Sequence, residues 1–412
     1  MQSKRLTLWI LFALVAGVVS GYVIHHSASG WAHAFAGYIS LLTDIFLRLI
    51  KMIIAPLVFS TLVVGIARMG DSSTIGRVGI KTFGWFIFMT VISLSLGLVM
   101  VNLLKPGVGL NLPLPDVMAS SGVSKGSMSL KDFLHHAFPT SIFDAMARNE
   151  ILQIVVFSLF FGVAAAALGK KGEALIADLD MVSHIMLRVT TYIMNFAPVA
   201  VFAAVAAVIA ENGVGILVSY GKFMLSFYAA MLILWAIIIG FGLAVVGGRT
   251  FALVRTIREP ILLAFSTASS EAAYPKTLEQ LERFGCSNRI ASFVLPIGYS
   301  FNLDGSMLYA TFGSIFIAQA YGIHLTLWQE ILMLLMLMVT SKGMAGVPRA
   351  SLVVIAATLG QFDIPEAGLL LLLGVDHFLD MGRSATNVLG NAVATAIVSK
   401  WEGQLHRHGG GE

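Results

Sequence analysis

The chain has 412 residues, of which 57% are hydrophobic and only 12% are charged, with a formal net charge of +4. Soluble proteins carry about 25% charged residues, so this composition excludes an ordinary soluble protein. A mean hydropathy of +0.86 instead places the chain in a bilayer. Basic loops beside membrane helices explain the small positive excess, so no nucleic-acid partner is expected. The single cysteine, Cys286, excludes an internal disulfide and a thiolate metal site.

Long charge-free stretches predict the membrane spans, because about 20 apolar residues are needed to cross roughly 30 Å of hydrocarbon. Six full spans are predicted before residue 250: residues 6–24, residues 38–67, and the stretches between Lys81 and Lys105, Glu150 and Lys170, Arg188 and Glu211, and Lys222 and Arg249. Lysine and arginine concentrate on alternate loops, which predicts a multi-pass protein of the plasma (inner) membrane with a cytoplasmic N-terminus. With two further spans after residue 250, the C-terminus is cytoplasmic as well.

After residue 250 two apolar stretches of 11 residues, 260–270 and 331–341, are too short to span the bilayer. Each leads into a turn of small residues and a second apolar piece, which predicts two re-entrant helical hairpins buried inside the protein. Each hairpin precedes a span interrupted by polar residues, at 302–305 and at 376–391. Paired interrupted segments of opposite topology indicate inverted repeats and a secondary transporter with its site at the midplane. The alternative is a structural bundle with incidental glycine and serine.

The last predicted span carries five polar residues at helical spacing: Asp376, Asp380, Arg383, Asn387 and Asn391. At about 100° per residue they share one face, within an arc of roughly 80°, and that face cannot point at lipid. An ionisable residue at membrane depth costs on the order of 3 kcal/mol and indicates a functional site. A structural ion pair of Arg383 with Asp376 or Asp380 is the alternative, but it leaves one acid for a bound amine or metal ion.

Four motifs follow one another between residues 260 and 402. They are Ser269-Ser270-Glu271-Ala272-Ala273-Tyr274-Pro275, Asn302-Leu303-Asp304-Gly305-Ser306, Ala345-Gly346-Val347-Pro348, and the run from Gly374 to Asn387. In this order they resemble the dicarboxylate/amino-acid:cation symporters, the glutamate transporter family. The resemblance implies an all-α polytopic membrane protein with eight transmembrane helices and two re-entrant hairpins. It also implies a homotrimer and an elevator mechanism, in which a transport domain moves against a scaffold.

The resemblance further implies the domain organisation. Scaffold helices 1–2 occupy residues 1–70, helix 3 of the transport domain 71–105, and the external loop with scaffold helices 4–5 residues 106–215. The rest of the transport domain occupies residues 216–402, followed by a flexible tail at 403–412. Within it we expect helix 6, hairpin 1 at about 250–285, helix 7 at about 289–322, hairpin 2 at about 325–362 and helix 8 at about 367–402.

For the substrate, the resemblance implies that Arg383 holds a side-chain carboxylate, which the guanidinium fork matches in two-point geometry. Asp380 would pair with the substrate's ammonium, and Asp376 would orient Arg383. Further substrate contacts are implied at Ser269, Ser270, Ser306, Val347, Ser384 and Asn387. Dicarboxylate members of the family lack an acid at the position of Asp380, so its presence favours aspartate or glutamate as substrate.

Several positions depart from the family pattern. Arg349 stands at the second hairpin tip, where glycine is frequent, and would shape the gate or meet the substrate's distal carboxylate. Asn391 stands where an aspartate ligand for sodium is usual, and Phe86 and Met89 replace the usual tyrosine and threonine, leaving Thr90. The remaining candidate sodium ligands are Asn302, Asp304, Asn387 and Asn391.

The coupling ion follows from these departures, because losing an anionic ligand raises the cost of dehydrating sodium. Glu271 adds a carboxyl in a partly dry setting, where desolvation favours the protonated form, so it could carry a proton. Its alternative role is a gate residue paired with Lys276 or with water. We therefore predict proton-driven symport of glutamate or aspartate, with sodium-coupled symport or C4-dicarboxylate symport as alternatives. An anion channel or an intramembrane enzyme is disfavoured, since no His-Glu-x-x-His pattern occurs. No cofactor is expected beyond the coupling cation, H⁺ or Na⁺.

Overall fold

The computed structural model describes residues 2–27, 29–67, 72–108, 138–213, 220–341, 350–373 and 375–406. These residues form helices and connecting turns, with one isolated antiparallel β-bridge between Cys286 and Leu405. The α-helices in chain order are α1 (Gln2–Ser27), α2 (Ser29–Ala67), α3 (Ser72–Leu104), α5 (Ile142–Arg148), α6 (Ile151–Ala167), α7 (Glu173–Met194), α8 (Ala197–Asn212), α10 (Gly221–Val246), α11 (Arg249–Thr256), α12 (Arg258–Thr267), α13 (Ser270–Phe284), α14 (Asn288–Phe301), α15 (Asp304–Ala320), α16 (Leu327–Thr340), α17 (Ala350–Leu359), α18 (Leu369–Leu373) and α19 (Asp376–Trp401). Short 3₁₀ turns occupy Gly169–Lys171, Gly360–Phe362 and Glu366–Gly368.

Long apolar helices confirm the prediction of an all-helical, membrane-embedded protein. In the described ranges four helices, α1, α2, α3 and α10, are long and apolar enough to cross a bilayer, and α7 with α8 makes a fifth if the bent pair is one span. The 17-residue α6 is shorter, and the segments after residue 250 are short or carry charges. The total of eight spans therefore stays a prediction.

The predicted fifth span, between Arg188 and Glu211, differs from the structure. The chain bends by 52° between α7 and α8, at Asn195 and Phe196. Pro198, in the first turn of α8, has no N–H to donate to the preceding turn, and its ring clashes with the carbonyl four residues earlier. A helix therefore ends before this proline and a new one begins in a different direction.

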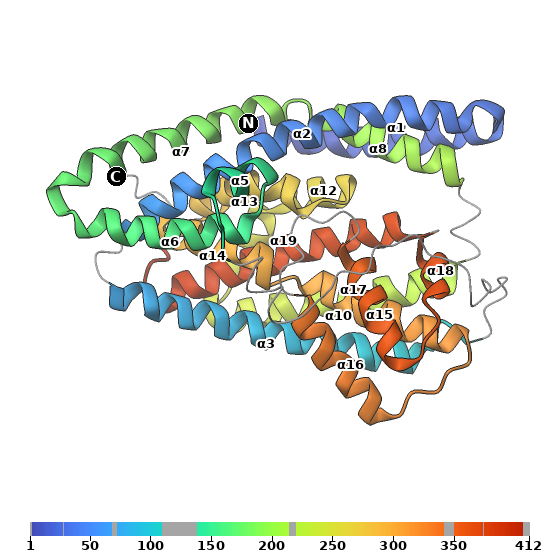
Figure 1. Cartoon of the computed structure of the whole chain (residues 1–412). Helices are drawn as coiled ribbons and strands as arrows, with labels where there is room; N and C mark the ends of the chain where they lie inside the picture. The colour runs from blue at the N-terminus through green and yellow to red at the C-terminus, as the bar shows by residue number, and fades with distance from the viewer. Residues whose placement is uncertain are drawn as a thin grey trace.

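The helices form two packing groups. In the first, α1 and α2 pack against α8, and α2 also packs against α6 and α7. In the second, α19 packs against α10, α12, α13, α14 and α15, while α3 packs against α10, α15 and α16. Figure 1 shows α1, α2 and α8 along one edge of the molecule and α3 and α16 along the opposite edge, with α19 between them. The groups meet where α12, α13 and α14 contact helices of the first group.

Close contact between α1 and α8 depends on two glycines one turn apart. A Cβ on Gly17 would lie 2.9 Å from the carbonyl oxygen of Phe202, and one on Gly21 would lie 2.7 Å from that of Ala206. Small residues at this spacing let two membrane helices approach at backbone distance. Larger residues at either position would push α1 away from α8.

Two pairs of packed helices occupy the predicted hairpin positions. Hairpin 1 consists of α12, a turn at residues 268–269, and α13, and its two helices pack against each other and against α19. Helices α16 and α17 also pack against each other and correspond to hairpin 2. Its tip, residues 342–349, lies outside the described residues, and so do Val347 and Arg349.

The residues after α19 form a C-terminal strap, residues 402–406, on the turn between α13 and α14. The N–H of Ser287 donates to the carbonyl of Gln404 at 3.1 Å, and the N–H of His406 donates to that of Gly285 at 2.9 Å. These bonds give residues 404 and 406 backbone partners within the stretch for which a flexible tail is predicted. Residues 407–412 lie outside the described part of the chain.

Candidate functional site

Helix α19 carries the predicted polar face without interruption, from Asp376 to beyond Asn391. The prediction of a broken span at residues 376–391 is wrong: the break lies just before Asp376, at Val375, the residue that precedes α19. Polar side chains at helical spacing do not compete with the backbone bonds of their own helix when other helices supply their partners. Asp376, Asp380, Asn387 and Asn391 are all buried, so the face lies inside the molecule.

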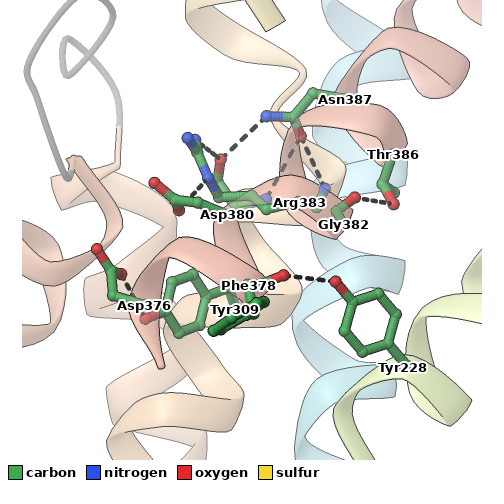
Figure 2. A network of polar contacts seen from close by, with 11 residues as sticks. Tyr228, Tyr309, Asp376, Phe378, Asp380, Gly382, Arg383, Thr386 and Asn387 are labelled. Atoms are coloured by element: carbon green, nitrogen blue, oxygen red, sulfur yellow. Dashed lines mark hydrogen bonds and ion pairs between the residues drawn. The ribbon is translucent and has the colours of Figure 1, made fainter. Parts of the chain in front are cut away.

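Arg383 is held on this face by an ion pair and a hydroxyl. Its Nε donates to Oδ1 of Asp380 at 2.7 Å, and its Nη1 donates to Oγ of Ser306, on α15, at 3.1 Å (Figure 2). The structure thus pairs Arg383 with Asp380, whereas the resemblance assigned Asp376 to orient it. Asp376 is seven residues from Arg383, which is about 10 Å along a helix, whereas Asp380 is only three residues from Arg383 and lies on the adjacent turn.

Asp376 instead contacts Tyr309, whose hydroxyl donates to Oδ1 at 2.8 Å (Figure 2). Tyr309 belongs to α15 and is completely buried. A buried carboxylate retains its charge most easily when it accepts hydrogen bonds, so this contact fixes the first turn of α19 against α15.

Asn387 joins α19 to the beginning of α15. Its Oδ1 accepts from the N–H groups of Gly305 at 2.8 Å and Ser306 at 3.4 Å, and its Nδ2 donates to Oγ of Ser306 at 3.1 Å. These are the second and third N–H groups of α15, which an N-cap side chain would normally satisfy, but here the cap comes from another helix. Gly305 allows the contact, because a Cβ there would lie 2.3 Å from the carbonyl oxygen of Arg383.

A second polar cluster lies around the turn between α14 and α15, and it includes Asn391, one helical turn after Asn387 on α19. Nδ2 of Asn302 donates to Oδ2 of Asp304 and to Oδ1 of Asn391, each at 3.2 Å. Ser93, on α3, donates to Oδ1 of Asp304 at 3.1 Å. All four side chains are buried, and among the described residues Oδ1 of Asn302 and Nδ2 of Asn391 find no hydrogen-bond partner. The cluster therefore holds oxygen atoms suited to a cation.

The structure brings together three of the four candidate sodium ligands. Asn302, Asp304 and Asn391 share the second cluster, whereas Asn387 lies one turn away and caps α15. Thr90 is completely buried on α3, three residues before Ser93. The described residues contain no group of three or more His, Cys, Asp and Glu side chains that could hold a metal, so any cation would rest mainly on amide, hydroxyl and backbone oxygens.

The turn of hairpin 1 carries the serine motif at the beginning of α13. Ala268 is in the left-handed region at φ 51°, and the side chain of Ser269 caps α13 by accepting from the N–H of Ala272 at 3.3 Å. Ser270 is buried, and Glu271 is half-buried in the first turn of α13. Lys276, the alternative partner for Glu271, forms ion pairs with Glu259 at 3.6 Å and Glu279 at 2.9 Å. Oγ of Ser384, another predicted substrate contact, is buried and has no hydrogen-bond partner in the described part of the chain.

Comparison with known proteins matches residues 6–401 to the model of the sodium:dicarboxylate symporter family. The chain belongs to this family. It is 41% identical to the proton/glutamate-aspartate symporter of Escherichia coli over 406 residues, 97% of this chain and 93% of that protein. It is 39% identical to the proton/sodium-glutamate symport protein of Geobacillus stearothermophilus over 418 residues, 100% of this chain and 97% of that protein. It is 40% identical to the C4-dicarboxylate transport protein of Laribacter hongkongensis over 413 residues, 98% of this chain and 92% of that protein.

Membership of a symporter family confirms that the chain is a transporter and not an enzyme. The glutamate and C4-dicarboxylate relatives have nearly the same identity to this chain, so sequence identity does not distinguish an amino-acid substrate from a dicarboxylate.

Two aromatic residues support the site and were not found from the sequence. The hydroxyl of Tyr228, on α10, donates to the carbonyl of Phe378, and Nε1 of Trp235 donates to Oγ1 of Thr386 at 2.7 Å. Figure 2 shows Tyr228 reaching α19 from the neighbouring helix. Both residues occur in a continuous apolar span, where no periodic pattern separates them from packing residues.

Proposed function

We propose that this protein is a secondary active symporter that imports glutamate or aspartate together with protons. The observation that carries the proposal is the ion pair between Asp380 and Arg383, inside the molecule and next to Ser306 and Asn387. A buried pair of opposite charges can exchange its mutual contact for a ligand that carries both charges. An acidic amino acid has an ammonium for Asp380 and a carboxylate for Arg383.

The same pair favours an amino acid over a C4-dicarboxylate. A dicarboxylate would occupy Arg383 and leave the carboxylate of Asp380 beside a second negative charge, in a site that water does not screen. An ammonium group removes that repulsion. The serines of hairpin 1 and the hydroxyl of Ser384 would then complete the contacts with the α-carboxylate and the amine.

Protons are the proposed coupling ions. Glutamate carries one net negative charge, and a co-transported proton makes the loaded site neutral, which lowers the cost of moving it through the bilayer. Glu271, half-buried beside Ser270 at the hairpin turn, is the proposed proton carrier. The sodium alternative rests on the second cluster, where Oδ1 of Asn302 has no partner and Asp304 supplies a negative charge.

The two packing groups support an elevator mechanism, which we propose operates in a homotrimer. We propose that α1, α2, α6, α7 and α8 form the scaffold, and that the helices around α19 form the transport domain. Every described contact of Arg383 and Asn387 comes from α15 or α19, so the site would move as one body. The described strap places the end of α19 beside the beginning of α3, which agrees with cytoplasmic N- and C-termini.

Uptake into proteoliposomes tests this function. Radiolabelled glutamate, aspartate and succinate would be offered under an imposed pH gradient without sodium, and under a sodium gradient at equal pH. We expect the pH gradient alone to drive accumulation of both amino acids, and succinate to be transported poorly. Uptake that requires sodium and ignores the pH gradient would establish the sodium alternative, and preferred succinate uptake would establish the dicarboxylate alternative.

A further inference from the structure

A groove separate from the transport site lies on the outward face of α3. It has a volume of about 400 Å³ and is lined by Ile80, Lys81, Gly84, Trp85, Phe88 and Trp401. The side chains of Ile80, Phe88 and Trp401 are 77%, 45% and 41% exposed. Since α3 is long and apolar enough to cross the bilayer, these exposed apolar walls face lipid.

Aromatic rings give the groove a fixed shape and a polar edge. The ring of Trp85 packs edge-on against Trp401 and against Phe241 of α10, with centroid distances of 5.8 Å and 5.7 Å. In the part of the chain that the structure describes, the indole N–H groups of Trp85 and Trp401 donate to no acceptor. Tryptophan prefers the level of the lipid headgroups, where its ring is in apolar surroundings and its N–H meets polar groups.

The end of the groove is positively charged. Lys81 donates to Glu402 at 2.6 Å and to the carbonyl of Trp401 at 3.3 Å, and Arg77 donates to the same carboxylate at 3.0 Å. Arg77 and Lys81 thus share the carboxylate of Glu402, and Lys400 adds a positive charge on the exposed last turn of α19. The side chains of Arg77 and Lys81 are 55% and 33% exposed, so both remain accessible from the membrane surface.

We infer that this groove binds one anionic phospholipid, with an acyl chain along Ile80, Gly84 and Phe88 and its phosphate beside Lys81. Charge complementarity decides the occupant, because the apolar length suits a hydrocarbon chain and the cationic end suits a phosphate. The two indole N–H groups would be available to the ester and phosphate oxygens of such a lipid. In the orientation predicted from loop charges, the lipid belongs to the cytoplasmic leaflet.

Gly84 provides a test that leaves the interior unchanged. A Cβ on Gly84 meets no atom within 4 Å, so Gly84→Leu fills the groove without a clash inside the protein. Gly240→Leu, on α10, is the matched control, because Gly240 is equally open and does not line the groove. Full-length protein would be equilibrated with equal amounts of phosphatidylglycerol and phosphatidylcholine, and the retained lipids would be measured by native mass spectrometry.

We expect the unmodified protein and Gly240→Leu to retain phosphatidylglycerol with about a fivefold preference, the effect of roughly one net charge at a membrane surface. Gly84→Leu should lose the preference, and Lys81→Gln should reduce it while lipid still binds. Equal retention of both lipids by the unmodified protein would overturn the proposal. So would displacement of phosphatidylglycerol by inorganic phosphate, or a change of oligomeric mass in Gly84→Leu, which would identify a second copy of the chain as the occupant.

Discussion

The backbone of Gly390 lies directly against the carboxylate of Asp304: a Cβ on Gly390 would stand 2.1 Å from Oδ2. This carboxylate is also held by Asn302 and Ser93. The absence of a side chain at Gly390 therefore allows Asp304, at the beginning of α15, to lie directly against α19.

Gly390→Ala should consequently displace Asp304 and disrupt the cluster. We expect glutamate uptake to fall about tenfold or more, because a carbon atom cannot be accommodated at that distance from a buried oxygen. Initial uptake rates in proteoliposomes measure the effect. Gly240→Ala is the control, since its Cβ meets nothing within 4 Å. Equal rates in both variants would show that Asp304 is not required in its present position.

Asp380→Ser removes the proposed partner of the substrate's ammonium. Loss of a charge-assisted hydrogen bond costs about 1.5–3 kcal/mol, so we expect aspartate and glutamate to bind about 10- to 100-fold more weakly. Succinate has no ammonium and should compete better than in the unmodified protein, because Arg383 is released. Competition binding measures both ligands, and size-exclusion chromatography checks the proposed trimer. Unchanged aspartate affinity would contradict the assignment.

Arg383→Ala removes the proposed partner of the substrate's carboxylate and also removes the ion-pair partner of Asp380. We expect acidic amino-acid uptake to be lost and small neutral amino acids such as serine to gain entry. Breaking a buried pair also destabilises a protein by about 3–5 kcal/mol, so thermal unfolding should be measured beside uptake. Arg383→Lys keeps the charge without the fork and should recover stability more than transport. If Arg383→Ala still prefers glutamate far above serine, Arg349 holds the carboxylate instead.

Glu402 should make stability depend on pH. Burial alone would raise its pKa, but hydrogen bonds and charges from Arg77 and Lys81 outweigh burial and lower the pKa below its ordinary value. Because the pKa of Glu402 is lowered in the folded state, its ion pairs stabilise the fold fully above about pH 5. This stabilisation is lost as the pH falls below about 4. The difference in melting temperature between the unmodified protein and Glu402→Gln should therefore shrink in acid. A difference that stays constant from neutral pH to acid would exclude this contribution.

The polar face of α19 could be predicted because helical spacing is a local property of the sequence. Asp380 and Arg383 are three residues apart, so their contact follows from the geometry of one helix. Asp376 is seven residues from Arg383, and its partner Tyr309 comes from a helix that no local pattern relates to it. Ser93 could have been found from Thr90, since residues three apart share a helix face.

The break between α14 and α15 at Asn302 and Leu303 was also predictable, because Asn302-Leu303-Asp304-Gly305 interrupts an apolar run. The bend between α7 and α8 was missed because charge-free length alone defined the fifth span. Pro198 was the signal for it. A proline within an apolar span changes direction without changing hydropathy.

The strap on hairpin 1 has a practical consequence for measuring movement. The backbone of His406 is hydrogen-bonded to the carbonyl of Gly285 and to the side chain of Arg249. A fluorophore joined after residue 406 would therefore travel with hairpin 1 and α19. A second fluorophore near the beginning of α1 would travel with α2 and α8. Energy transfer between the two chain ends would then test whether the packing groups move relative to each other during a transport cycle, without a cysteine being introduced near the proposed substrate site.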